Sequence, residues 1–163
     1  MIRTCKIKLD VSLKQEDRIF DILNSCRELY NAALQQRIEA WKKQKITLTL
    51  YDQQKELTLL RKEEEVYRIL PVDLTRLTSL DRLDKAFKSF YRRVKKEGSH
   101  GFPRFKWKER FDTLVFGKQG WKVAGSRLIL RTKPEPIILK MQNSLHRKGE
   151  IRRIEITKRA GKW

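Results

Sequence analysis

One strand-like segment stands alone ahead of a long stretch of helical periodicity, and this order constrains the fold more than any other feature. Residues 2–11, IRTCKIKLDV, alternate Cys5, Ile7 and Leu9 with lysines, which predicts a half-buried strand. A lone strand can neither pair its backbone nor bury its apolar face. The strand therefore needs partners from later in the chain, and the sequence predicts a sheet interrupted by an inserted helical segment.

The inserted segment has apolar residues at the three-and-four spacing of helices. Ser12 followed by Gln15 is the pattern of a capping box, and it predicts where the first helix begins. Pro71 suits the first turn of the last helix, which we expect to end at Gly98. The predicted helices run from 13 to about 43, from 49 or 50 to roughly 65, and from 71 to 97. The apolar stripe predicted for the last one consists of Leu74, Leu77, Leu80, Leu83, Phe87, Phe90, Tyr91 and Val94.

After Gly101 the pattern changes to short apolar runs separated by Gly, Ser, Pro and Asn. Such runs predict strands and turns, and Ala124-Gly125-Ser126 is expected at a hairpin tip. The predicted strands lie in TLVF, WKVAG, RLILR, PIILKM and EIRRIEITKR. The fold class is therefore α+β: a small β-barrel-like domain with a helical bundle inserted after its first strand.

The charge of the chain points to a polyanionic partner. Lys and Arg number 39 against 20 Asp and Glu, a net charge of +19. The excess is concentrated in residues 101–163, which hold 17 Lys and Arg and five Asp and Glu. Nucleic acid rewards such a surface through counterion release. A membrane is not expected as partner, because no run approaches about 18 apolar residues and no signal peptide opens the chain.

The sequence has no pattern of a catalytic or metal site. P-loop, H-E-x-x-H and G-x-S-x-G motifs are all absent, so we do not expect this chain alone to be an enzyme. Cys5 and Cys26 occupy apolar positions and are expected to be buried free thiols in a reducing cytosol. With His100 and His146 they form no cluster of zinc-ligand spacing.

Residues 98–116, GSHGFPRFKWKERFDTLVF, alternate rings and cations and allow two interpretations. In one, this is a buried strand in which Phe105 and Trp107 point inward and the lysines face water. In the other, the cations meet phosphates and an exposed ring stacks on a base. Alternation lets both hold at once. We expect the cations to contact nucleic acid and the rings to be mainly scaffold, with Phe102 and Phe105 sealing the joint between the helical and β parts.

Four segments together resemble a known family. RELYNAALQQRIEAWKK (27–43), ELTLLRK (56–62), LDRLDKAFKSFYRRVKKEGSHGFPRFK (80–106) and EIRRIEITKRAGKW (150–163) are similar to the N-terminal half of TnpB. These proteins are transposon-encoded RNA-guided DNA endonucleases, related to the compact type V CRISPR effectors. The resemblance follows the chain in order over nearly its whole length, and the segment from Asp84 to Lys106 is its most specific part.

The resemblance implies a division of the chain. Residues 1–10 and 99–163 would form the wedge domain, an oligonucleotide-binding-like β-barrel, and residues 11–98 the helical recognition lobe. In the family, the wedge domain grips the guide RNA scaffold. The recognition lobe, together with the wedge, reads a short motif beside the DNA target and holds the guide–target duplex.

Site residues follow from the resemblance and from the charge. The expected guide-RNA contacts are Arg104, Lys106, Lys108, Arg110, Lys122, Arg127 and Arg131. The expected contacts to the target-adjacent DNA are Tyr51, Lys55, Leu74, Leu77, Thr78, Phe116 and Lys118. The expected lining of the duplex channel is Lys88, Arg92, Arg93 and Lys96. The family often has Gln or Lys where this chain has Leu77 and Asp73, so the adjacent motif that it reads could differ.

The family continues from a strand like ITKRAGKW into a RuvC-like nuclease and a zinc ribbon. This sequence stops at Trp163, before the first catalytic Asp, so Mg²⁺ and Zn²⁺ are expected only in that other half and not here. The expected partners are guide RNA, target DNA and a separate RuvC-containing chain, in a prokaryotic cytoplasm and at the nucleoid when DNA is bound. Three alternatives remain open: a guide-independent DNA-binding transposon regulator, an assembly subunit pairing with a separate nuclease chain, and a ribosomal-type RNA binder.

Overall fold

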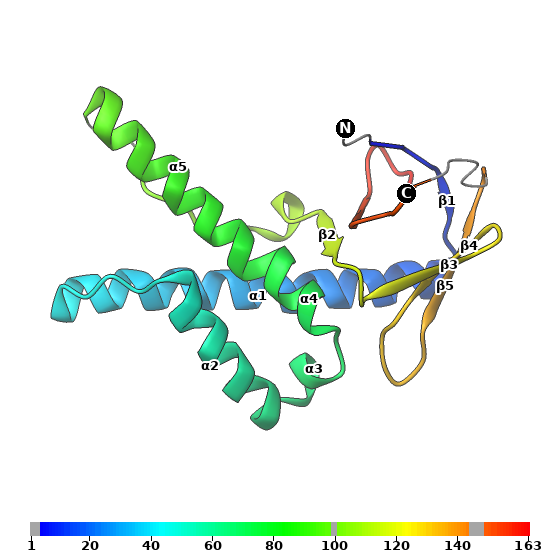
Figure 1. Ribbon diagram of the computed structural model, residues 1–163, viewed down its shortest axis with the longest axis horizontal. Coiled ribbons are helices and arrows are strands. Elements are labelled where there is room, and N and C mark those ends of the chain that lie inside the picture. The colour runs from blue at the N-terminus through cyan, green and yellow to red at the C-terminus, as the bar shows by residue number, and fades with distance from the viewer. Residues whose placement is uncertain (1–3, 99–100, 144–148) are drawn as a thin grey trace.

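The computed structural model describes residues 4–98, 101–143 and 149–163, and it is a mixed α+β structure. Figure 1 shows α1 (Leu13–Gln44) as the longest element, with the strands gathered near its N-terminal end. Helices α2 (Leu50–Glu63) and α5 (Asp81–Glu97) leave α1 in different directions, α5 toward the upper left and α2 toward the lower right. None of the described helices combines the length and apolar character that a membrane crossing requires.

Helix α1 begins and ends close to the predicted residues. Ser12 caps its start: the hydroxyl accepts from Gln15 N–H at 3.4 Å, and Ser12 N–H donates to Gln15 Oε1 at 3.0 Å. The predicted capping box is confirmed. One continuous face of the helix is buried, formed by Ile19, Ile22, Leu23, Cys26, Leu29, Tyr30, Ala33, Leu34 and Arg37.

The second helix is shorter than predicted. Thr49 and Asp52 form a capping box at the start of α2, which begins at Leu50, in agreement with the predicted start at residue 49 or 50. The helix ends at Glu63, and a separate single turn, α3 (Glu65–Arg68), follows. Only Gln53 and Leu57 of α2 are buried, so α2 is attached along a narrow stripe.

The third predicted helix contains a π-helical turn that periodicity could not reveal. The helical segment runs through α4 (Val72–Thr75), the π turn η1 (Arg76–Leu80) and α5, and Gly98 follows it at a φ of 86°. The wider turn buries Thr78 and Ser79. Ser79 Oγ donates to the Cys26 carbonyl of α1 at 2.7 Å, so the π turn is joined to α1 by a buried polar contact.

The far half of α5 departs from the predicted stripe. Leu74, Leu80, Leu83 and Phe87 are buried, but Tyr91 and Val94 are exposed. In Figure 1 this half of α5 projects away from α1. The stripe predicted for Tyr91 and Val94 is therefore wrong for the single chain, since no element of the described structure covers that end.

The strands form two antiparallel sheets. The four-stranded sheet has the order β1-β5-β4-β3, with β1 (Leu9–Asp10) paired to β5, and β2 pairs with β6 in the second sheet. The remaining bounds are β2 (Thr113–Phe116), β3 (Trp121–Ala124), β4 (Arg127–Leu130), β5 (Ile137–Met141) and β6 (Ile154–Thr157). The prediction that the first strand joins later strands is confirmed, as is the hairpin tip at Gly125, whose φ is 59°.

Two expectations for the β part do not hold. Within the described residues 4–11, the first strand pairs only over Leu9–Asp10, and Cys5 is exposed rather than buried. Residues 2–3 of the predicted strand lie outside the described residues. Cys26 is buried as predicted, and burial raises the pKa of its thiol to about 12. Within the described residues the two sheets are not hydrogen-bonded to each other, so the strands do not close into one continuous barrel.

Helices and strands share one core. Alternate residues of β5 (Ile137, Leu139, Met141) are buried, as are Leu128 and Leu130 of β4. They belong to the same cluster of buried residues as the inner face of α1. The helical insertion and the sheet are thus packed against each other and not merely linked.

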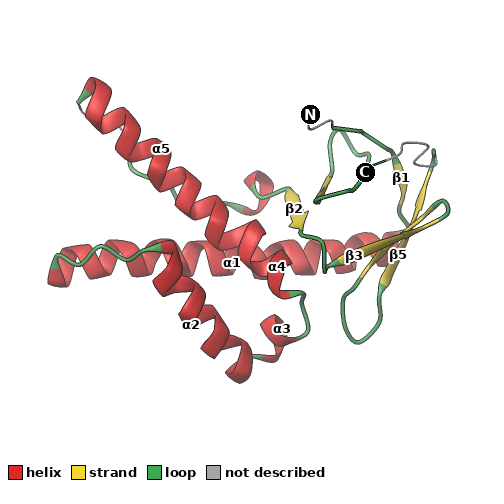
Figure 2. Ribbon diagram, viewed as in Figure 1, coloured by secondary structure: helices red, strands yellow, loops and turns green. Residues whose placement is uncertain are grey.

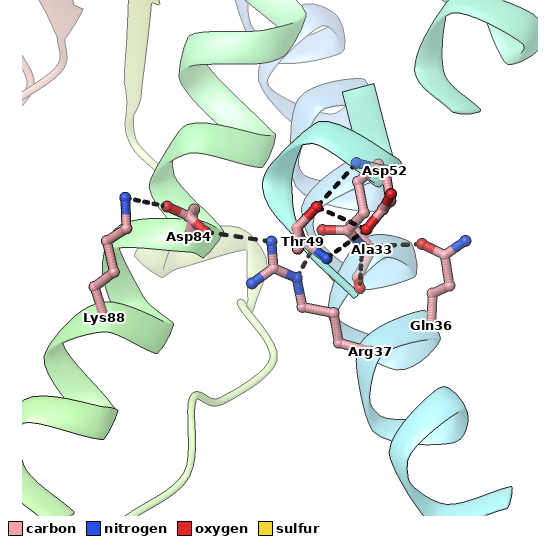
Figure 3. A network of polar contacts seen from close by, with 8 residues as sticks. Ala33, Gln36, Arg37, Thr49, Asp52, Asp84 and Lys88 are labelled. Atoms are coloured by element: carbon pink, nitrogen blue, oxygen red, sulfur yellow. Dashed lines mark hydrogen bonds and ion pairs between the residues drawn. The ribbon is translucent and has the colours of Figure 1, made fainter. Parts of the chain in front are cut away.

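A buried cation joins the three long helices (Figure 3). Arg37 of α1 donates through Nε to Gln53 Oε1 of α2 at 2.7 Å, and its Nη2 lies 3.5 Å from Asp84 Oδ1 of α5. Gln53 in turn donates to the Ala33 carbonyl at 2.8 Å. Burial lowers the pKa of Arg37, an effect that the Asp84 carboxylate opposes. Lys88 completes the pairing of Asp84 at 2.8 Å.

A second polar junction attaches the last described residues to α1. Glu16 accepts hydrogen bonds from the Lys158 ammonium and, at 2.9 Å, from Trp163 Nε1. The Trp163 ring packs on Phe20 with centroids 5.7 Å apart, and its carbonyl accepts from Leu9 N–H at 3.0 Å. The hydrogen bonds from Lys158 and Trp163 lower the pKa of Glu16.

We expect Arg37→Ala to lower the free energy of unfolding by about 3 kcal/mol, because it leaves Gln53 and Asp84 without their shared donor. Urea denaturation followed by circular dichroism measures this. Arg92→Ala, an exposed arginine of α5, is the matched control and should change stability by less than about 0.5 kcal/mol. Equal stability of the two variants would contradict the role of the network.

We expect the junction at Glu16 to weaken in acid. A carboxyl whose pKa is lowered in the folded state adds stability above its unfolded pKa, and that stability is lost as pH falls through the folded pKa. The stability difference between the wild type and Glu16→Gln should therefore be largest near pH 6 and shrink below the ordinary value of 4.5. Asp17→Asn, at an exposed position of the same turn, is the control and should change stability by less than about 0.5 kcal/mol.

Candidate nucleic-acid interface

Residues 102–110, which we call the Trp107 loop, connect the helical segment to the second half of the chain. They form an extended loop ending in a 3-10 turn over Lys108–Arg110, and not the buried strand considered from the sequence (Figure 2). Trp107 is 74% exposed and Phe105 44%. The interpretation in which both rings point into the sheet is therefore wrong, because no strand pairing turns this segment inward.

One side chain of α1 fixes the loop at its centre. The Asn31 amide accepts from Lys106 N–H at 2.8 Å and donates to the Lys106 carbonyl at 3.0 Å. Both backbone groups of residue 106 are thereby satisfied by one side chain, as in one rung of a sheet. The loop is held against α1 although it belongs to no regular element.

Three cations converge where the loop meets α5, and we call them the cation cluster: Arg82, Lys106 and Arg110. The Arg82 guanidinium lies over the ring of buried Phe111, 4.6 Å from its centroid. Burial lowers the pKa of Lys106, and the charges of Arg82 and Arg110 lower it further. In the described part of the chain none of the three is paired with an acid. The cluster is therefore a site where an anion would relieve repulsion.

Phe102 packs at the joint between α5 and the Trp107 loop. Its ring meets those of Phe87 and Phe90 edge-on, with centroids 5.4 and 5.2 Å apart. This packs the start of the Trp107 loop on α5, as the sequence suggested for Phe102. Phe105 is 44% exposed, close to the 45% of Phe102, but no ring pair of the described residues includes it, so its part in the seal stays a prediction.

The predicted RNA contacts divide into two groups. Arg104, Lys106, Lys108 and Arg110 lie on the Trp107 loop, and all but half-buried Lys106 are exposed. Lys122 and Arg127 lie on the solvent-facing side of the four-stranded sheet, where Arg127 is opposite Lys140 and Lys122 opposite Ile129. Arg131 follows β4 and donates to the Gln119 carbonyl at 3.3 Å. The two groups occupy different elements of the molecule (Figure 1).

Three of the predicted DNA contacts are packing residues. The side chains of Leu74, Thr78 and Phe116 are fully buried, so they offer no surface to a ligand in this structure. The Thr78 hydroxyl accepts from Val115 N–H at 2.9 Å and donates to the Val115 carbonyl at 3.2 Å. These contacts attach the π turn to β2. The side chains of the three residues therefore have a structural role here instead of the predicted contact with DNA.

The other predicted DNA contacts are accessible. Tyr51 is 64% exposed at the start of α2, and the Lys55 ammonium lies 4.4 Å from its ring centroid. Leu77 is half-buried. Lys118 is exposed and paired with Glu150. Among these four, Tyr51 with Lys55 forms the one aromatic–cationic pair.

Asp73, at the position where the resemblance suggested base reading, is held by the turn after β2. Asp73 Oδ2 accepts from Gln119 N–H at 3.2 Å. The turn can close on the carboxylate because residue 117 is glycine: a Cβ there would lie 2.5 Å from Asp73 Oδ2. Asp73 therefore positions the segment carrying Lys118.

The predicted duplex-channel residues lie along α5. Lys88, Arg92 and Lys96 recur every four residues and share one face, with Arg93 beside them. All four are exposed. Lys88 is paired with Asp84 at the edge of the Arg37 network, so this row of cations begins where the helices are joined.

Asn31 and Arg82 were missed from the sequence as members of the interface. Asn31 lies in the segment RELYN, but no sequence pattern marks it as a contact residue, since a lone Asn on a helix is usually solvated. Arg82 lies three residues before Lys85 in the basic helix, and the loop that it meets begins 20 residues later in the sequence, at Phe102. No signal within either segment reveals these contacts.

Comparison with known proteins adds no relative: no protein-family model matches the chain, and no curated protein matches it. Among the residues that the structure describes, no group of three or more His, Cys, Asp or Glu is placed to hold a metal ion.

We expect Gly117→Ala to lower the free energy of unfolding by about 1–3 kcal/mol, because its Cβ would overlap Asp73. Thermal or urea unfolding measures the loss. Adding Asp73→Ala should restore part of it by removing the overlapping carboxylate. Gly101→Ala is the control, since its nearest atom would be 4.0 Å away, and it should be neutral. A neutral Gly117→Ala would contradict the close packing of this turn.

Proposed function

We propose that this chain is the nucleic-acid-binding part of an RNA-guided DNA nuclease of the TnpB type. It would bind the scaffold of the guide RNA and help recognise the DNA motif beside the target. The observation that carries the proposal is the cation cluster beside an exposed tryptophan on one loop. Among the described residues no acid forms an ion pair with the cluster, and a phosphate chain supplies such charges.

The proposed division of labour follows the resemblance. The strands at 9–10 and 113–157 would be the wedge, an oligonucleotide-binding-like barrel completed by the bound RNA or by further protein. The helices would be the recognition lobe. Their joint, the Trp107 loop, is where we propose the guide scaffold binds, through Arg104, Lys106, Lys108 and Arg110. The outer sheet face with Lys122 and Arg127, and Arg131 beyond it, would extend that contact.

The remaining surfaces are proposed for DNA. The accessible pair Tyr51 and Lys55, with Lys118, would meet the target-adjacent DNA. The row formed by Lys88, Arg92, Arg93 and Lys96 would line the guide–target duplex, since cations four residues apart on a helix can follow a phosphate backbone. The chain would carry no catalytic residue and no metal, and DNA cleavage would come from a RuvC-containing half. The proposed location is the prokaryotic cytoplasm, at the nucleoid when bound to DNA.

We expect the chain to bind RNA carrying the transposon end more tightly than random RNA of equal length, and both more weakly as salt rises. Filter binding over a salt series measures this. Lys106→Gln should reduce the slope of log affinity against log salt by about one. Lys62→Gln, an exposed lysine at the far end of α2, is the matched control and should leave the slope unchanged.

Three outcomes would contradict the proposal, and each would favour a different function. Equal affinity for the two RNAs would leave a nonspecific basic protein. Tight binding to a duplex DNA site without RNA would favour a guide-independent regulator. Binding of RNA only after addition of a RuvC-containing chain would favour an assembly subunit.

A further inference from the structure

Trp107 exposes a flat apolar face that nothing in the described structure covers. Its 74% exposure exceeds the 53% of Trp41, whose ring is covered by the Lys45 ammonium 5.4 Å from its centroid. Trp163 packs on Phe20. Among the described residues, Trp107 alone of these three indoles has neither a ring nor a cation on it. Water solvates such a face poorly, so a ligand that covers it gains free energy.

The charges around Trp107 identify the chemistry of that ligand. Lys106, Lys108 and Arg110 flank the ring along the chain, and Arg82 of α5 lies over the ring of Phe111, the residue after Arg110. An uncharged apolar partner would bury these cations at a cost. A ligand that presents flat rings and anionic groups a few ångströms apart satisfies both requirements, and nucleotides have this composition.

We propose that Trp107 stacks on the base of an unpaired nucleotide of the bound RNA, while the cation cluster binds the adjoining phosphates. This rests on the proposed function and adds the class of RNA recognised. In a duplex, both faces of each base are already stacked on neighbouring bases. An exposed ring therefore selects a loop, a bulge or a single strand, and it does so without reading the base identity.

Asn31 acts as the positioning residue for this site. Its two hydrogen bonds fix the backbone of Lys106, the residue between the ring and Phe105. Trp107 has an extended backbone, with φ −81° and ψ 162°, and leads directly into the 3-10 turn that carries Arg110. Holding residue 106 on α1 thus sets the ring and the cation cluster in one arrangement before RNA binds, which reduces the ordering required on binding.

The test compares single-stranded RNA with blunt duplex RNA and with single-stranded DNA of the same length, using the whole chain. Trp107→Ala should weaken single-strand binding roughly tenfold and leave duplex binding unchanged, while Trp107→Phe keeps most of the affinity. Trp41→Ala is the control and should have no effect on either. Single-stranded RNA should also quench tryptophan emission in the wild type, and less so in Trp107→Phe.

Each result decides between the two proposals. Equal single-strand affinity of Trp107→Ala and Trp41→Ala would overturn stacking while leaving RNA binding by the cations intact. Failure of the wild type to bind any RNA would overturn the proposed function as well. A loss confined to single-stranded DNA, with RNA unaffected, would overturn the assignment to RNA.

Asn31→Ala separates positioning from general stability. It should weaken single-strand binding in the wild type but have much less effect in Trp107→Ala, because its contribution acts through the ring. Asn31→Asp keeps the acceptor for Lys106 N–H and should lose less. Additive losses from Asn31→Ala and Trp107→Ala would show that Asn31 only stabilises the fold and would overturn its positioning role.

Discussion

The need to bury one continuous face of α1 governs the whole molecule. A helix of 32 residues is about 48 Å long, which is far more than the length that can pack against either sheet. Its N-terminal turns therefore meet β5 through Gln15 and the residues after β6 through Glu16, and its later turns meet α2 and α5 through Arg37. Because both parts of the chain bury apolar surface on the same helix, one cluster of buried residues serves them both.

Buried polar side chains make this packing specific. Apolar contacts tolerate sliding, whereas a buried donor without its acceptor costs free energy. Arg37 and Gln53 fix α1 against α2, Ser79 fixes the π turn against α1, and Thr78 fixes the same turn against β2. Asn31 extends the principle to the surface, where a loop without regular structure is held by both backbone groups of one residue. The candidate interface is thus attached to the rigid part of the fold.

Local patterns predicted the elements well, because their causes are local. Ser12 with Gln15, the glycine at 98 and the alternation of β5 act within a few residues, and the structure has each of them. The errors concern what lies opposite a residue. One interpretation of the sequence points Phe105 and Trp107 inward, but no strand receives them, and the resemblance places Thr78 and Phe116 at a ligand although they are core. The family resemblance gave roles to positions, but it could not show which of those side chains reach solvent.

The amino-acid sequence by itself determined the order of elements, the α+β class, the return of the first strand to a later sheet and the concentration of positive charge after residue 101. These depend on composition, on periodicity and on the impossibility of a lone strand. The tertiary structure decided which cations converge and which rings stay exposed. Asn31 holds Lys106 and Arg82 lies over Phe111, and such contacts between distant segments depend on packing geometry that no local pattern carries.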